Sequence, residues 1–129
     1  MANKNTFSVE IVEHNFGEEL TARERIMLKD TQNAVRLDKI VDPDSPMVIE
    51  FEHYAVIKVH NENGKVDKDY TQYIIIDKGG QKYVTGSVTF WNSFMDIYRE
   101  MGGEAFSIEV VKHPSKNFEG KYFMTASII

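Results

Sequence analysis

Lys82–Thr89, with the sequence KYVTGSVT, runs directly into Phe90–Met101, with the sequence FWNSFMDIYREM, and this junction decides the fold. The first segment has the Val, Tyr and Thr content of a strand. Thr89 is a good N-cap, and Gly102-Gly103 tolerates the positive φ at which helices end. Between them two apolar stripes recur at helical spacing: Phe90, Phe94, Ile97 and Met101, and beside them Trp91, Met95 and Tyr98. We therefore expect a strand followed by a helix that faces the core.

Four further segments have strand patterns, two before this junction and two after it. They are Met47–Asn61, Tyr70–Asp77, Phe106–Lys112 and Lys121–Ile129. With the strand at 82–88, the order is three strands, a helix and two strands. This order is typical of the OB-fold, a small β-barrel. The sequence therefore predicts an all-β fold with one or two helices, built as a five-stranded OB-fold barrel whose helix lies between strands three and four.

Met47–Asn61 is the longest strand pattern and alternates throughout. Its odd positions, from Met47 to Val59, are mostly apolar and are expected to face inward. A strand of this length suits a small barrel, in which the first strand contributes to both halves of the sheet. Asn63-Gly64 supplies turn chemistry, and we expect a loop of about eight residues before the second strand.

The N-terminal third is predicted to be an extension packed on the barrel. Phe7–Val12 alternates as a short strand, and Thr21 and Glu24 form a capping box for a helix over Ala22–Asp30. Its buried residues are expected to be Ile26, Met27 and Leu28. Ala34–Val41 is ambiguous between strand and helix. The breaker cluster at 42–46 then separates an extension, residues 1–42, from the barrel, residues 43–129, within a single domain overall.

Composition indicates a folded intracellular protein. The 129 residues are 42% hydrophobic and 12% aromatic, which supports a core and argues against disorder. There is no cysteine, so disulfides and thiolate metal sites are excluded. No apolar h-region follows Met1, and no apolar run approaches the ~18 residues of a membrane span. We therefore expect a soluble protein of the cytoplasm.

The net charge of −5 counts against a nucleic-acid-binding protein, because such proteins usually carry a basic footprint. The charge is unevenly distributed, however. Residues 1–50 hold six Lys and Arg against ten Asp and Glu, whereas residues 51–129 hold nine against ten. The acidic excess therefore lies mostly in the first 50 residues.

Catalysis and metal binding find no support in the sequence. The four histidines, His14, His53, His60 and His113, are widely spaced and none pairs with a second at metal-ligand spacing. Gly79-Gly80 is too short to hold a phosphate, and no Gly-x-Ser-x-Gly nucleophile motif occurs. We expect a protein that is not an enzyme, with no cofactor and no metal.

Lysines and aromatic residues interleave in the segments that would line the binding face of such a barrel. Proteins that bind single strands need cations for phosphates and aromatic rings for bases. The candidate nucleic-acid-binding residues are Lys65, Lys68, Tyr73, Lys78, Lys82, Tyr83, Lys112, Lys116, Phe118, Lys121 and Tyr122. Two alternatives stay open: Phe118 could cover the barrel end, and Tyr73 with Tyr83 could be a cross-strand pair that stabilises the sheet.

Several segments resemble small OB-fold proteins encoded by phages, prophages and conjugative plasmids of Gram-positive bacteria. They are KYVTGS at Lys82–Ser87, FWNSF at Phe90–Phe94 with Ile97-Tyr98, PSKNFEGK at Pro114–Lys121, and the N-terminal Leu28-Lys29-Asp30, Asn33-Ala34 and Leu37-Asp38. The resemblance covers most of the chain from Thr21 onward. It implies a single-stranded DNA-binding protein of a mobile genetic element that serves replication or conjugation.

The expected partner is thus single-stranded DNA, bound without strong sequence preference, with self-association along the DNA and no membrane or small-molecule substrate. Cellular single-strand binders end in an acidic tail, whereas this chain ends in Ala126–Ile129 within the last strand pattern. Recruitment of partners by such a tail is therefore not expected. The alternative is a protein-interaction module without catalytic activity that docks replication or transfer machinery through its N-terminal segment.

Overall fold

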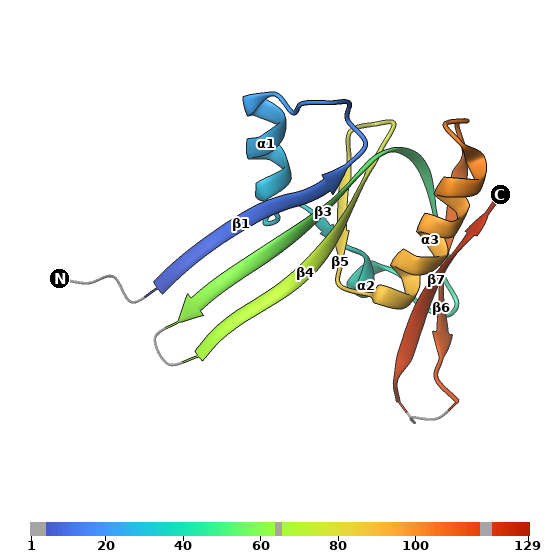
Figure 1. Cartoon of the computed structure of the whole chain (residues 1–129). Coiled ribbons are helices and arrows are strands. Elements are labelled where there is room, and N and C mark those ends of the chain that lie inside the picture. The colour runs from blue at the N-terminus through green and yellow to red at the C-terminus, as the bar shows by residue number, and fades with distance from the viewer. Residues whose placement is uncertain (1–4, 64–65, 117–119) are drawn as a thin grey trace.

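The chain folds into one strongly curled sheet with three short helices (Figure 1). This computed structural model describes residues 5–63, 66–116 and 120–129, without the side chains at 5–7, 62–63 and 66–68. The strands are β1 (Asn5–His14), β2 (Val35–Arg36), β3 (Met47–Asn63), β4 (Val66–Asp77), β5 (Lys82–Thr85), β6 (Ser107–Pro114) and β7 (Tyr122–Ile128). The helices are α1 (Ala22–Lys29), α2 (Leu37–Ile40) and α3 (Val88–Met101). The prediction of a mostly β, barrel-like fold with few helices is confirmed.

β3 is the strand that joins the two halves of the sheet. The strand order is β2-β5-β4-β3-β6-β7, and β1 also pairs with β3. The first residues of β3, 47–50, pair with β6, whereas the rest of the strand pairs with β4 on one edge and β1 on the other. Figure 1 shows the result: the β1-β3-β4 ribbon and the β6–β7 hairpin project as two separate arms.

A β-bulge in β3 overturns the prediction that its odd positions all face one core. The register with β4 shifts between Phe51 and His53, so Glu52 is an extra residue on β3. A one-residue shift exchanges the two faces of a strand. Ile49 and Phe51 therefore share a core with Tyr54, whereas Ala55 and the later odd positions face the opposite side. β3 is consequently buried on both faces around residues 54–57.

The first of these cores, which we call the α3 core, lies beneath α3. It gathers Phe51, Tyr54, Phe90, Trp91 and Phe94, with α2 and the inner faces of β6 and β7. Phe90 and Phe94 are fully buried, as the helical stripes predicted, and the ring of Phe51 meets that of Phe94 edge-on at 5.1 Å. Such edge-to-face pairs stabilise a core beyond the area they bury.

The second core, the α1 core, lies between α1 and the other face of the sheet. Leu28 is fully buried there against Ala55, Ile57 and Ile74. The predicted capping box is present, because the Thr21 side chain accepts from the Glu24 amide and Glu24 accepts from the Thr21 amide. The prediction that Ile26 is buried is wrong: it is 71% exposed. Ile26 lies about 200° around the helix from Leu28 and so faces away from the sheet.

Three predicted boundaries also differ. Asn63 and Val66 form a cross-strand pair, so two residues, not eight, separate β3 from β4. Asp67, Lys68 and Asp69 therefore belong to β4. β5 ends at Thr85, and Ser87, whose hydroxyl accepts from the Phe90 amide, caps α3 in place of Thr89. The segment Ala34–Val41, which the sequence left ambiguous, contains a short strand, β2, followed by a short helix, α2.

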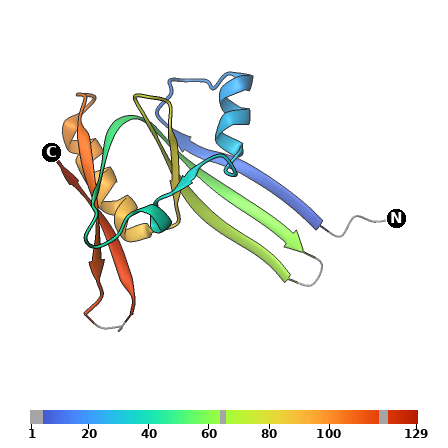
Figure 2. The same ribbon diagram turned by 180° about the vertical axis from the view of Figure 1, so that it is seen from behind.

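The sheet curls but stays open between β5 and β7 in the described pairings. β5 pairs with β2 on the edge away from β4, and β7 pairs with β6 alone. α3 lies along β7 instead (Figures 1 and 2), where the Ser93 hydroxyl accepts from the Ala126 amide at 2.7 Å and donates to the Phe90 carbonyl at 2.8 Å. The side chain of a helix residue thus accepts a hydrogen bond from an edge amide of β7 at the contact between α3 and β7, which we call the α3–β7 seam.

Among the described residues no helix has the length and apolarity needed to cross a membrane.

Ser93→Ala should destabilise the fold by about 1 to 3 kcal/mol, because it leaves the Ala126 amide without an acceptor. Asn92→Ala, an exposed neighbour on the same helix, is the matched control and should change stability little. Urea denaturation of the two variants beside the wild type measures the difference. Equal midpoints for all three proteins would show that the seam does not depend on this bond.

Tyr54 should make the fold less stable in alkali. Burial raises its pKa above the ordinary 10.0, helped by the hydrogen bond that its hydroxyl donates to Glu13 at 2.6 Å. Above about pH 10 the unfolded tyrosine loses its proton while the folded one keeps it, so the free energy of unfolding falls as the pH rises. Tyr54→Phe should flatten this fall, whereas Tyr70→Phe, at an exposed tyrosine, should not. Denaturation at pH 9 to 11.5 tests this; the same slope in both variants would contradict it.

Candidate nucleic-acid interface

The β6–β7 hairpin carries four of the predicted residues, Lys112, Lys116, Lys121 and Tyr122. Its strands pair from Ile108 and Ile128 out to Pro114 and Tyr122, and the Ser115 amide donates to the Lys121 carbonyl at 2.9 Å. Lys116 and Lys121 are exposed at the outer end. Phe118, the aromatic residue predicted in the connecting loop, lies outside the described residues. The hairpin, which projects as one arm (Figure 1), therefore carries three lysines and a tyrosine.

Tyr122 and Lys112 lie on the inner face of this arm, continuous with the α3 core. Tyr122 is 53% exposed, and the Lys112 ammonium lies 5.6 Å from the centroid of its ring. Lys112 also donates to the Asp38 carbonyl at 2.8 Å, which anchors it to α2. Its nitrogen is a fixed cation beside an open ring. This pairing orients the ring and leaves π surface for another planar group.

Phe123 lies on the opposite face of the arm, as the next residue of a strand must. It is 40% exposed and stacks on the imidazole of His113 at 4.9 Å between centroids. The imidazole nitrogen Nε2 is 2.9 Å from the Thr125 hydroxyl oxygen, which fixes the ring from its other side. Phe123 is absent from the sequence-based candidates. The adjacent aromatic residues Tyr122 and Phe123 could have indicated it. Neighbouring side chains of a strand point to opposite faces, so at least one of the two rings must face away from the core.

A shallow cavity of about 80 Å³ lies at the base of the arm. Tyr122, Phe123 and Lys112 line it, together with Met124, Ser87 and Asp38. Ser87 is the N-cap of α3, so the positive end of a fourteen-residue helix faces this region. The carboxylate of Asp38 is negative, but it already accepts a hydrogen bond from the Thr85 hydroxyl at 2.7 Å. This cavity therefore combines the open ring of Tyr122 with mixed charge.

Lys82 and Tyr83 lie inside the protein, away from this arm. Lys82 is 7% exposed, and its ammonium donates to the carbonyls of Met27 and Asp30 at the C-terminal end of α1. Burial lowers its pKa, which nearby Asp30 partly offsets. Tyr83 is also 7% exposed and donates to Asp77 at 3.1 Å; burial and this bond raise its pKa. Both residues join elements of the fold, so neither presents its polar group on an open surface.

The remaining candidates are dispersed. Tyr73 is half-buried and stacks on Trp91 at 4.7 Å within the α3 core. It is not the cross-strand partner of Tyr83, because Tyr73 is opposite Thr85 and Tyr83 is opposite Ile75 in the β4–β5 register. Lys78 is exposed at the β4–β5 turn, beside a cavity lined by Tyr98 near the end of α3. The backbone of Lys68 pairs with Asn61 on the ribbon, whereas its side chain and Lys65 lie outside the described parts.

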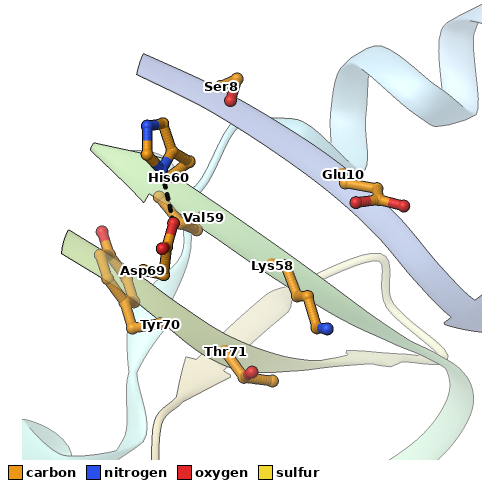
Figure 3. Close-up of a pocket in the computed structure, with 8 residues that line it drawn as sticks. All are labelled: Ser8, Glu10, Lys58, Val59, His60, Asp69, Tyr70 and Thr71. Atoms are coloured by element: carbon orange, nitrogen blue, oxygen red, sulfur yellow. Dashed lines mark hydrogen bonds and ion pairs between the residues drawn. The ribbon is translucent and has the colours of Figure 1, made fainter. Parts of the chain in front are cut away.

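A polar hollow on the β1-β3-β4 ribbon is acidic in character. It measures about 350 Å³ and is lined by Ser8, Glu10, Lys58, Val59, His60, Asp69, Tyr70 and Thr71 (Figure 3). His60 Nδ1 lies 2.5 Å from an Asp69 oxygen, shown as the dashed line. Two carboxylates and one lysine thus line this hollow, and their net negative charge disfavours the binding of a phosphate group.

Within the described ranges no group of three or more potential ligands is arranged for a metal ion.

No protein-family model, no curated protein and no solved structure matches this chain.

Lys82→Ala should destabilise the protein by about 1.5 to 3 kcal/mol, because hydrogen bonds from a charged donor to two carbonyls are lost. Lys78→Ala, on the exposed turn four residues earlier, is the control and should leave stability unchanged. Thermal and urea denaturation of both variants measure this. If the Lys82 variant is as stable as the Lys78 variant, the structural role of Lys82 is contradicted, and Lys82 again becomes a candidate for binding nucleic acid.

Proposed function

We propose that this protein binds single-stranded DNA with little sequence preference through the β6–β7 arm. The observation that carries the proposal is the presence, on one projecting hairpin, of two exposed aromatic rings, Tyr122 and Phe123, one on each face, together with three lysines of the same hairpin. Stacking of a base on an aromatic side chain contributes roughly 1–3 kcal/mol and tolerates any base, because every base has a π face. Lys112, Lys116 and Lys121 supply the cations for the phosphates.

The architecture supports the same proposal. From β3 to β7 the chain has three antiparallel strands, a helix and a hairpin, and β3 pairs with β6. This order is compatible with an OB-fold opened between its third and fifth strands, and OB-folds commonly bind single strands with their open face and loops. The role that fits the sequence resemblance is replication or transfer of a mobile genetic element in the cytoplasm, as a binding protein without catalysis.

The distribution of charge also supports the arm over the ribbon. Phosphates would meet carboxylates in the hollow that holds Glu10 and Asp69, whereas the outer end of the arm presents Lys116 and Lys121. Binding through few cations on an acidic protein is expected to be weak at high salt, because ion release supplies much of the affinity.

The test is fluorescence anisotropy with labelled oligo-dT at low and high salt. We expect binding at low salt that weakens with salt, and replacing both Lys116 and Lys121 by glutamine should reduce the slope of log K against log salt by about 1.4, since each phosphate contact on a single strand contributes about 0.7. Tyr122→Ala and Phe123→Ala should each weaken binding by about tenfold, within the range for one stacked base.

Tyr70→Ala is the matched control, because Tyr70 is an exposed tyrosine of the ribbon, 43% exposed, beside the acidic hollow. It should bind oligo-dT as the wild type does. Absence of binding at low salt would overturn the proposed function. Equal losses in the Tyr70 and Tyr122 variants would instead overturn the choice of the β6–β7 arm.

A further inference from the structure

β1 is a long strand with one unpaired edge. Its ten residues pair with β3 alone among the described strands. In an antiparallel pair every second residue turns its N–H and C=O away from the partner, so β1 offers a row of backbone donors and acceptors along its outer edge as far as Ile11, where a bulge interrupts the register. Protein edges are usually protected by lysine, proline or a covering element. Residues 5–14 contain neither lysine nor proline.

α1 does not cover this edge but forms a groove along it. α1 lies over the face of the sheet that carries Ala55 and Ile57 and contacts β1 there (Figures 1 and 2). The groove between them measures about 380 Å³. Val9, Ile11 and Leu20, all half-buried, form its apolar part.

The wall that α1 contributes is basic. Arg25 and Lys29 are exposed, line the groove and are four residues apart, so they lie on one side of the helix. Two carboxylates also line it. Glu10 is opposite Lys58 in the β1–β3 register and therefore belongs to the other face of the strand, whereas Glu19 precedes the helix. The side of the groove toward α1 thus combines apolar side chains with two cations and the Glu19 carboxylate, and Arg25 Nη1 donates to the Leu20 carbonyl at 2.6 Å.

We propose that this groove binds an extended acidic peptide segment of a partner protein by strand addition to β1. The unpaired edge requires an extended backbone, because only a strand presents N–H and C=O groups at the matching spacing. On the side toward α1 the segment places apolar side chains against Val9 and Ile11 and carboxylates against Arg25 and Lys29. The site is separate from the β6–β7 arm, so the peptide and single-stranded DNA can bind together.

The probe is a fluorescein-labelled peptide in which threonine alternates with valine and glutamate in turn, so that valine and glutamate share one face of the strand. Anisotropy titration should show saturable binding by the full chain. Arg25→Glu combined with Lys29→Glu should weaken it by about tenfold through like-charge contacts. Arg23→Glu is the matched control, since Arg23 is exposed on the same helix but does not line the groove, and should change binding little.

Amide hydrogen exchange locates the peptide. The expected result is new protection in β1 upon binding, with oligo-dT affinity unaffected by the peptide. The proposal is overturned if the peptide fails to bind at millimolar concentration, if the protected amides lie outside β1, or if the Arg23 control loses affinity equally. It is also overturned if β1 becomes protected as the protein concentration rises without peptide, because a second copy of the chain then occupies the edge.

Discussion

The bulge at Glu52 is the constraint on which the rest of the structure depends. It lets one strand supply side chains to two cores, because Phe51 and Tyr54 face α3 whereas Ala55 and Ile57 face α1. Without the extra residue, every apolar side chain after Phe51 would point to the wrong side. The bulge also turns the strand, so that its first residues pair with β6 in one arm and its last residues extend the other.

α3 then determines how far the sheet can close. The helix lies against β7, and Ser93 occupies the Ala126 amide that a neighbouring strand would otherwise use. The curled sheet therefore ends at β7 on one side and at the β2–β5 pair on the other. The two arms remain apart and present different chemistry: the β6–β7 arm carries lysines with open rings, and the ribbon carries the Glu10 and Asp69 hollow.

The packing of the helices on the sheet determines which lysines are buried and which stay on the surface. Lys82 is enclosed because β5 passes beneath the end of α1, whose last carbonyls need donors. Lys112 is tied to α2 but keeps its ammonium beside an exposed ring. A count of charges in the sequence treats these lysines alike, and only the fold separates the cation that stabilises α1 from those that remain available to a ligand.

Local patterns in the sequence determined the elements themselves. The capping box at Thr21 and Glu24, the apolar stripes of α3 and the alternation of β6 needed no tertiary information, because each follows from the geometry of a single helix or strand. The tertiary structure alone decided which faces those elements bury. The bulge at Glu52, the burial of Tyr83 and the exposure of both Tyr122 and Phe123 depend on residues distant in the chain. Burial is a property of what packs against a side chain, and no single segment contains that information.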